Sequence, residues 1–218
     1  MNINSHPAKS RPVPGFSTPA VGFEAPFDML EACHERVSDR LALLARLQIH
    51  LQVSGCDAQA RQAAADVLRY FDLAAPLHHQ DEEIHVFPPL LASPDTALVQ
   101  AVRGLQAQHR AMEQAWARTR RVLLAVLACD SPAVVPWNGL EAAAVLAFTT
   151  AYDGHIRLEE AIVYPAARHT LSALQWQAMS ADMMSRRGVI GQVAATPPTT
   201  LEVDPLNKPK PFGSQASS

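Results

Sequence analysis

Apolar residues recur at intervals of three and four over most of this chain, as they do along the buried face of an α-helix. The first such run predicts a helix from about Phe27 to Val53, and Gly55 is well placed to end it. A histidine occupies one position of its apolar face, which comprises Leu30, His34, Val37, Leu41, Leu44 and Leu51. This face is predicted to pack into a core.

A second helix is predicted from about Asp57 to Leu91. Pro76 lies inside it, so we expect a kink or a break there, because proline lacks the backbone N–H that a helix interior needs. One face again mixes apolar and ionisable residues, namely Leu68, Phe71, Ala75, His78, Glu82 and His85.

Two further long helices follow. The third begins after Ser93, with Pro94 in its first turn, and extends to about Ala128. Its face comprises Leu98, Val102, Leu105, His109, Met112, Trp116, Thr119, Leu123 and Val126. The fourth follows Pro136 and extends to about Arg168. Its face comprises Ala144, Phe148, Ala151, His155, Glu159 and Ile162.

A shorter fifth helix, predicted over 171–187 with Trp176, Met179 and Met183 at helical spacing, is expected to pack across one end. Four amphipathic helices with short Pro- or Gly-marked connections predict an all-α fold, an antiparallel up-down four-helix bundle. We assign residues 26–187 to this domain. Residues 1–25 and 188–218 are rich in proline and poor in large apolar residues, so they predict a flexible lead-in and a disordered tail.

Composition narrows the possible partners and location. The 218 residues carry a net charge of −3, and without a long basic run they disfavour nucleic acid or an anionic membrane as a partner. No apolar run is long enough for a transmembrane helix, and the N-terminus lacks the apolar core of a secretory signal. Cys33, Cys56 and Cys129 are an odd, widely spaced set, which predicts reduced thiols in a cytoplasmic protein.

Two stretches of the chain repeat one phrase. In both 78–88 and 155–165 a histidine precedes a glutamate by four residues, a second glutamate follows, and an aromatic-Pro pair closes the phrase. Four residues are about one helical turn, so each His and Glu share a face and can offer imidazole and carboxylate to metal ions. The two helices that carry the phrase are second and fourth, so they run in the same direction and can present their ligands at the same depth.

Several ionisable residues fall on faces that should be buried, which is costly unless they are paired or bind metal. The candidate metal ligands are His34, His78, Glu82, His109, His155 and Glu159. Six ligands from four helices provide for two closely spaced ions, and imidazole with carboxylate suits iron, manganese or zinc. Taken alone, His34 or His109 would more often be a hydrogen-bonded core residue; the repeated phrase favours ligation.

The sequence leaves the roles of several neighbouring residues open. His79, Glu83 and Glu160 lie about 100° away from the ligand face and are expected to support the ligands or to lie at the surface. Glu113, four residues after His109, and His85, three after Glu82, stay open between ligand and surface residue. Tyrosines that either donate hydrogen bonds near the metal or pack in the core are Tyr70, Tyr152 and Tyr164. Histidines not expected to bind are His6, His50 and His169.

At these residues the sequence resembles the hemerythrin HHE cation-binding family over about residues 27–168. The resemblance rests on the early histidine, on HHxxEExxxFP in the second helix, on QHRAME in the third and on HxxxEExxxYP in the fourth. It implies a four-helix bundle with a non-haem di-iron centre bound by the six candidates named above. It also implies binding of O₂ or a related diatomic molecule, oxygen or redox sensing, nitric oxide response or iron handling.

The resemblance departs from the oxygen-carrying members at one place. Those proteins look to use two histidines four apart on the third helix, whereas Glu113 holds the second place here. This disfavours simple reversible O₂ carriage. No catalytic residue is predicted, and binding is favoured over catalysis. Alternatives are a ferritin-like di-iron oxidase or peroxidase, whose Glu-x-x-His pattern occurs here once, and a metal-free or zinc-bearing interaction module.

Overall fold

The computed structural model describes residues 22–129 and 137–188, and every regular element in these ranges is a helix. The predicted all-α class is therefore confirmed for the part of the chain that the structure describes. The predicted flexible lead-in and disordered tail lie almost wholly outside the described residues and stay predictions. Within those ranges, no helix has the length and apolar character needed to cross a membrane.

Two to four residues join successive helical stretches, except between α5 and α6, where residues 130–136 are not described. The first is α1 (Pro26–Val53), and a continuous helical stretch follows, made of α2 (Ala58–Arg69), η1 (Tyr70–Ala74), α3 (Ala75–Asp81), η2 (Glu82–Val86) and α4 (Phe87–Leu91). After it come α5 (Thr96–Leu127), a second composite stretch of α6 (Gly139–Leu158), η3 (Glu159–Val163) and α7 (Tyr164–Thr170), and finally α8 (Ala173–Arg186).

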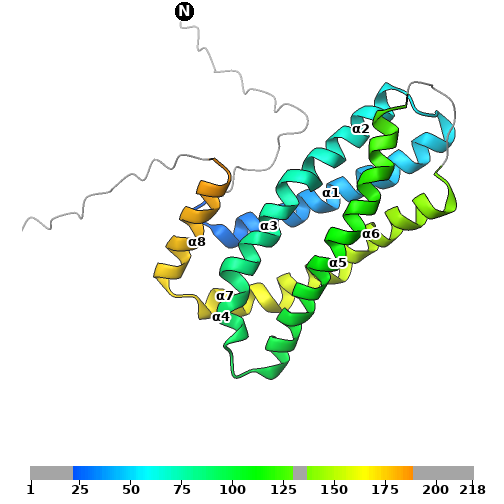
Figure 1. The fold of residues 1–218 in the computed structure, drawn as a ribbon. Coiled ribbons are helices and arrows are strands. Elements are labelled where there is room, and N and C mark those ends of the chain that lie inside the picture. The colour runs from blue at the N-terminus through cyan, green and yellow to red at the C-terminus, as the bar shows by residue number, and fades with distance from the viewer. Residues whose placement is uncertain (1–21, 130–136, 189–218) are drawn as a thin grey trace, which may run out of the picture.

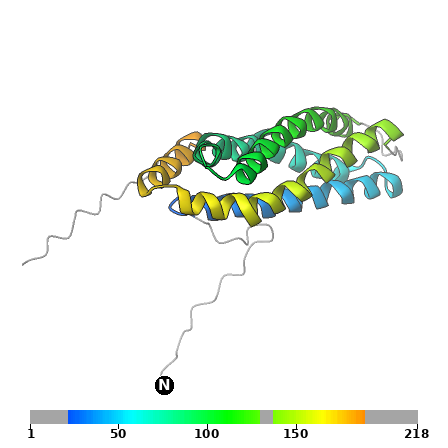
Figure 2. The same ribbon diagram turned by 90° about the horizontal axis from the view of Figure 1, so that it is seen from below.

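Four long helical stretches lie along one common axis (Figure 1), and a view from below shows them in two layers (Figure 2). One layer holds α5 and the α2–α4 stretch, and the other holds α1 and the α6–α7 stretch. Helix α8 packs against α1 and α3 at one end of the molecule, as the sequence predicted for the fifth helix.

The starts of the helices have identifiable local causes. Helix α5 begins at Thr96, two residues after Pro94, because the side chain of Asp95 caps it by accepting hydrogen bonds from the N–H groups of Ala97 and Leu98. Pro94 therefore precedes the helix instead of lying in its first turn. Asn138 forms a capping box with Glu141 at the start of α6, which fixes that start after the undescribed segment 130–136.

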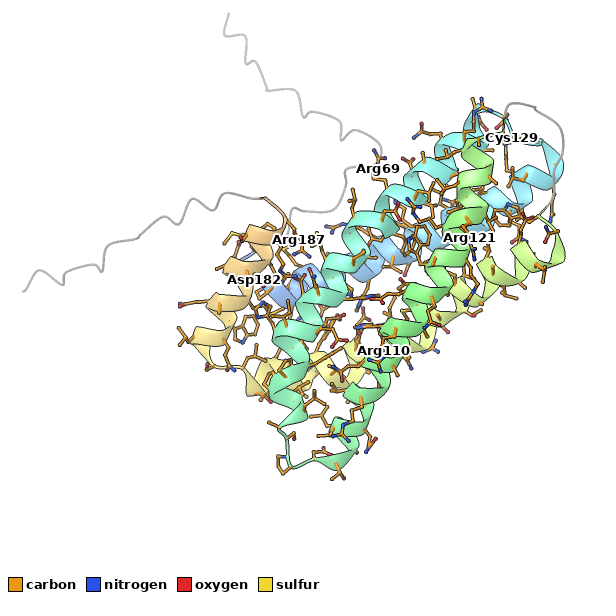
Figure 3. All side chains as sticks on the ribbon, in the orientation of Figure 1. Arg69, Arg110, Arg121, Cys129, Asp182 and Arg187 are labelled. Carbon is orange, nitrogen blue, oxygen red and sulfur yellow. The ribbon has the colours of Figure 1, made fainter. Side chains whose placement is uncertain are left out.

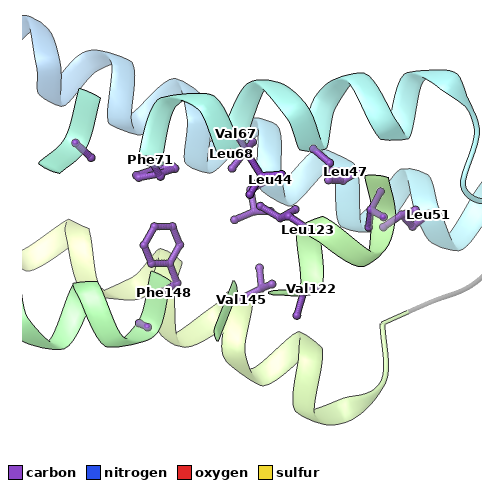
Figure 4. Close-up of a cluster of buried hydrophobic side chains, with 14 of the residues drawn as sticks. Leu44, Leu47, Leu51, Val67, Leu68, Phe71, Val122, Leu123, Val145 and Phe148 are labelled. Atoms are coloured by element: carbon purple, nitrogen blue, oxygen red, sulfur yellow. The ribbon is translucent and has the colours of Figure 1, made fainter. Parts of the chain in front are cut away.

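Two hydrophobic clusters fill the space between the helices. The cluster at the far end from α8 is shown in Figure 4, where Leu44, Leu68 and Leu123 point toward one another from three different helices. The second cluster lies at the α8 end and includes Phe27 and Met179. In each of the four long stretches the predicted ligands fall between residues of one cluster and residues of the other. The candidate site is therefore closed by apolar packing on both sides.

Each long stretch that carries the repeated phrase widens into π-helical turns. Three such turns occur in the described residues, and each begins six residues before a proline; they start at Tyr70, Glu82 and Glu159, ahead of Pro76, Pro88 and Pro165. A proline in a helix donates no hydrogen bond and its ring clashes with the carbonyl four residues back. The residue just before each proline instead donates to the carbonyl five residues back, as Tyr164 does to Glu159. The kink or break expected at Pro76 is therefore a π-helical turn through which the helix continues.

The π-helical turns shift the buried face. An extra residue in a turn advances the following positions by about 100°. At the end of η3, Val163 is fully buried, while Ile162, predicted on the buried face, is 49% exposed. At the end of η2, Val86 is buried in the same way, and His85 leaves the face that it was predicted to share with Glu82. Both predictions were wrong because they assumed an unbroken α-helical period.

Candidate metal centre

The structure brings all six predicted ligands together between the two hydrophobic clusters. They come from α1 (His34), α3 (His78), the first residue of η2 (Glu82), α5 (His109), α6 (His155) and the first residue of η3 (Glu159). None of the six side chains has more than a few per cent of its surface exposed. The buried ionisable groups predicted from the sequence therefore face one another.

One half of the site pairs two histidines with one oxygen of each glutamate. His34 Nε2 lies 3.1 Å from His78 Nε2 and 3.1 Å from Glu159 Oε2. His78 Nε2 lies 3.6 Å from Glu82 Oε1. These four residues each offer a ligand atom within 4.8 Å of the others.

The other half uses the second oxygen of each glutamate. His109 Nε2 lies 3.2 Å from His155 Nε2 and 3.4 Å from Glu82 Oε2. His155 Nε2 lies 2.9 Å from Glu159 Oε1. This set of four also lies within 4.8 Å. Glu82 and Glu159 belong to both sets, so each carboxylate faces both histidine pairs.

This donor set fits two cations that share two carboxylates. Ligand atoms at about 2.1 Å from one ion and at right angles to each other lie roughly 3 Å apart, close to the spacings within each set. Glu82 Oε2 and both oxygens of Glu159 are buried, and the groups beside them are histidine Nε2 atoms, which can donate a hydrogen bond only when they carry a proton. Buried carboxylate oxygens in such a state are costly unless a cation compensates them.

Three of the four imidazoles are oriented through their other nitrogen. His34 Nδ1 lies 2.8 Å from Glu160 Oε1, and His109 Nδ1 lies 3.0 Å from Glu83 Oε1. His155 Nδ1 lies 2.9 Å from Gln108 Oε1. An acceptor at Nδ1 keeps the proton there and leaves the Nε2 lone pair facing the centre.

The supporting role predicted for Glu83 and Glu160 agrees with these contacts, whereas Gln108 was missed. It lies on α5 and serves a histidine of α6. Its place before His109 in the sequence carries no signal for that contact.

Tyr164 also belongs to the site. Its hydroxyl donates a hydrogen bond to Glu82 Oε1 at 2.5 Å and lies 3.2 Å from His34 Nε2. The hydroxyl of Tyr70 instead donates to the carbonyl of Cys33, away from the centre. Of the three tyrosines left open by the sequence, Tyr164 is the one that holds a candidate ligand.

The buried carboxyl and imidazole groups of the site shift one another's pKa values. Burial, together with the neighbouring Glu159, raises the pKa of Glu82 to about 8. Burial also opposes ionisation of Glu159, but hydrogen bonds from His109, His155 and His34 outweigh it and hold that pKa well below its usual range. For His109, burial favours the neutral ring, but hydrogen bonds to Glu159 and Glu82 raise the pKa to about 10. Without a metal ion, protons on Glu82 and His109 offset the negative charge of the two carboxylates. Metal cations bound at the same place would offset that charge instead.

A cavity of about 270 Å³ opens beside the half of the site that holds His109 and His155, the second histidine pair. Its lining is mostly apolar and aromatic, and comprises Phe71, Ala75, Pro76, His79, Met112, Glu113, Trp116 and Tyr152. It is wide enough for a small molecule to reach the wall of the candidate centre.

His79 forms the part of that wall next to the ligands. Its ring stacks on His109 with centroids 4.0 Å apart and planes 14° apart, and only 9% of the residue is exposed. A ligand atom of His79 also lies within 4.8 Å of those of His109 and His155. The lone pair of an imidazole nitrogen lies in the plane of its ring, so two stacked rings point their lone pairs in parallel planes. His79 and His109 therefore cannot both bind one ion unless a ring rotates. His79 therefore buttresses His109 and lines the cavity.

The remaining histidines and Glu113 lie apart from both ligand sets. Glu113 is exposed at the cavity and belongs to neither set. His85 Nε2 lies 2.7 Å from Asp182 Oδ2 on α8, so the single Glu-x-x-His pattern does not bring its histidine to the centre. His50 pairs with Asp57, and His169 is exposed. His6 lies outside the described residues.

Comparisons with known proteins agree with this geometry. The family model described as the hemerythrin HHE cation binding domain matches residues 25–167, close to the 27–168 expected from the motifs. A protein from Haemophilus influenzae (strain ATCC 51907 / DSM 11121 / KW20 / Rd), described as an uncharacterized protein, is 32% identical over 165 residues. These cover 75% of this chain and 91% of that protein.

Proposed function

Because this chain belongs to the hemerythrin HHE cation-binding family, we propose that it holds a non-haem di-iron centre and uses it to bind or sense a small diatomic molecule. The molecule bound is O₂ or the related nitric oxide. What the protein senses in this proposal is the presence of that molecule or the redox state of the irons. The ligands in this proposal are those of the two four-residue sets, with Glu82 and Glu159 common to both.

The shared carboxylates carry the proposal. Two anionic side chains that each face two histidine pairs offset half of the charge of two divalent cations, and together with the histidines they give each cation four ligand residues. Mixed nitrogen and oxygen ligands suit iron. The chemistry that two ferrous ions would supply is the donation of two electrons to a bound diatomic molecule.

The chain's own residues provide access and a dry environment. Leu105, Met112 and Phe148 are buried next to the site and exclude water from it. The cavity lined by His79 gives a small molecule a route to the second histidine pair. His79 has no hydrogen-bond partner among the described residues, so its ring N–H is available to a molecule held in the cavity.

The antiparallel up-down order of the four long helical stretches is part of this proposal. It is supported by the connection of only four residues between α1 and α2, since a short loop joins neighbouring helices that reverse direction. A cytoplasmic location is proposed from the three cysteines, which lack the paired spacing of a secreted scaffold. Iron handling is the alternative use of the same site.

Metal analysis of the purified full-length protein after anaerobic loading with ferrous iron tests the centre. We expect about two irons per chain, because the two ligand sets are each complete. The variant His155→Ala should bind about one iron or none. His169→Ala, which alters an exposed histidine, is the matched control and should keep both irons. One zinc per chain, with iron excluded, would contradict a di-iron centre.

Exposure of the loaded protein to air tests ligand binding. A visible absorption band that appears with O₂ and fades when O₂ is removed supports binding or sensing. Irreversible bleaching with release of iron favours iron handling instead.

His79→Phe tests the cavity. Phenylalanine keeps a flat ring against His109 and removes the N–H, so the iron content should be unchanged. Affinity for nitric oxide, followed by absorbance, should fall about five- to tenfold, as expected for the loss of one hydrogen bond worth about 1 kcal/mol. Equal affinity in the variant would show that His79 does not contact the bound molecule.

A further inference from the structure

Two cysteines that are far apart in the sequence meet at the end of the molecule opposite α8. Figure 3 shows Cys129 at the end of α5, beside the start of α2 and opposite Asp182 and Arg187. Cys56 lies in the short connection between α1 and α2. Cys56 and Cys129 line one cavity, and the Cys129 thiol is near enough to Cys56 to raise the pKa of the Cys56 thiol. The sequence predicted scattered, reduced thiols, and the fold brings two of them together.

The backbone around this pair is held by one side chain. Arg61 Nη1 donates a hydrogen bond to the carbonyl of Cys56 at 3.1 Å and to that of Cys129 at 3.3 Å. The thiol of Cys56 also donates to the carbonyl of Val126 at 3.3 Å. Both cysteine backbones are therefore fixed relative to each other before any bond forms between the sulfur atoms.

We propose that Cys56 and Cys129 form a redox-active dithiol site that is converted reversibly to a disulfide by low-molecular-weight disulfides. It is separate from the metal centre, and the third cysteine, Cys33, takes no part in it. The proposal does not depend on the presence of iron.

The exposure of the two thiols assigns their order of reaction. Cys56 is buried, and Cys129 is partly exposed. Both line a cavity of about 80 Å³ together with Trp137 and Glu141, which gives a small reagent access to the pair. Burial, with the adjacent Cys129 thiol, raises the pKa of Cys56 to about 11, so Cys56 stays protonated at neutral pH. Cys129 therefore reacts first.

The proposed reaction is two thiol–disulfide exchanges. The Cys129 thiolate attacks one sulfur of glutathione disulfide, forms a mixed disulfide and releases one glutathione, which takes up the proton of Cys129. Cys56 then attacks the Cys129 sulfur and displaces the second glutathione, which takes up the proton of Cys56. The protein loses two hydrogens and two electrons, and one glutathione disulfide becomes two glutathione molecules.

The test is incubation of the full-length protein with glutathione disulfide, followed by alkylation in denaturant, trypsin digestion and mass spectrometry. Arg61 and the other arginines place Cys56 in peptide 47–61 and Cys129 in peptide 122–157. We expect these two peptides to become linked, free thiols to fall from three to one, and dithiothreitol to reverse both changes.

Matched variants separate this site from other chemistry. Cys33→Ser should still form the link, whereas Cys129→Ser and Cys56→Ser should not, with helical circular dichroism confirming that each variant folds. The oxidised protein should melt roughly 5–10 °C higher, because the bond closes a long loop in the unfolded chain. A stable glutathione adduct on Cys129 without the cross-link, unchanged thiols, or a link that involves Cys33 would each overturn the proposal.

Discussion

Single hydrogen bonds at Nδ1 set the direction of three imidazoles among the candidate ligands. Glu160, Glu83 and Gln108 each hold one ring so that Nε2 faces the centre. Removing such a hydrogen bond typically lowers the affinity of a metal site about 10- to 100-fold. The orientation of each ring therefore matters to metal binding as well as the identity of each ligand.

Glu160→Ala should lower the affinity for iron about 10- to 100-fold, because His34 loses the acceptor that fixes its ring. Competition with a chelator of known affinity measures the change. The iron affinity of Glu160→Gln should lie between those of Glu160→Ala and the native protein, because the amide oxygen of glutamine still accepts the hydrogen bond from His34. Glu35→Ala, at an exposed position of the same helix α1, is the control. Equal losses in Glu160→Ala and Glu35→Ala would reject an orienting role.

At the scale of the elements, the repeated phrase specifies a backbone conformation as well as a pair of ligands. The proline that closes each phrase lies six residues after the glutamate, and the π-helical turn between them starts at that glutamate. Both carboxylates shared by the two ligand sets therefore lie where the helix widens. π-helical turns are frequent at functional sites for this reason, since they redirect side chains within a continuous helix.

The shifted register of the helix at the end of η3 gives a direct test. Val163→Ala should destabilise the protein by about 2 kcal/mol, because it removes buried methyl groups and leaves a cavity. Ile162→Ala, at the adjacent and half-exposed position, should change stability by less than about 0.5 kcal/mol. Urea unfolding of both variants measures the difference. The reverse ranking would show that the helix keeps its α-helical register.

At the scale of the whole molecule, α8 closes one end of the bundle with apolar contacts and ion pairs. Met179 and Met183 are fully buried against the adjacent cluster, and Trp176 lies 5.0 Å from the ring of Phe27. The buried carboxylate of Asp81, one residue before Glu82, pairs with Arg186 of α8 and with Arg187, the residue that follows this helix. Docking of α8 therefore bears directly on the helical stretch that carries two of the six candidate ligands, His78 and Glu82.

Docking of α8 should weaken in acid through Asp182. The hydrogen bond from His85 holds the pKa of Asp182 below its usual range, with a further contribution from Arg186. A carboxyl group of this kind stabilises the fold above its unfolded pKa, near pH 4, and loses that effect as pH falls through its lower folded value. The effect should be small, because the Asp182 side chain is 38% exposed.

Fluorescence of Trp176 measures this weakening in a protein whose two other tryptophans, Trp116 and Trp137, are replaced by phenylalanine. We expect a red shift as pH falls below about 4. Asp182→Asn in the same background should remove part of that pH dependence. An identical titration in both proteins would show that the contact with His85 does not hold α8.

The sequence by itself determined the helices, their approximate ends and the identity of the six candidate ligands. Helical period and proline position are local properties, and a histidine or glutamate on an apolar face stands out without any knowledge of its neighbours. The repeated phrase then indicated that two of the four helices contribute in the same way.

Only the tertiary structure decided which groups meet. Gln108 beside His155, His79 stacked on His109, and Cys56 beside Cys129 are contacts between segments far apart in the sequence, which no spacing along one helix encodes. The register near each of Pro76, Pro88 and Pro165 likewise depends on whether the backbone bends or widens, and the structure shows the wider, π-helical turn at all three. The sequence predicted the six candidate ligands, and the packing of the helices fixed which groups lie beside them.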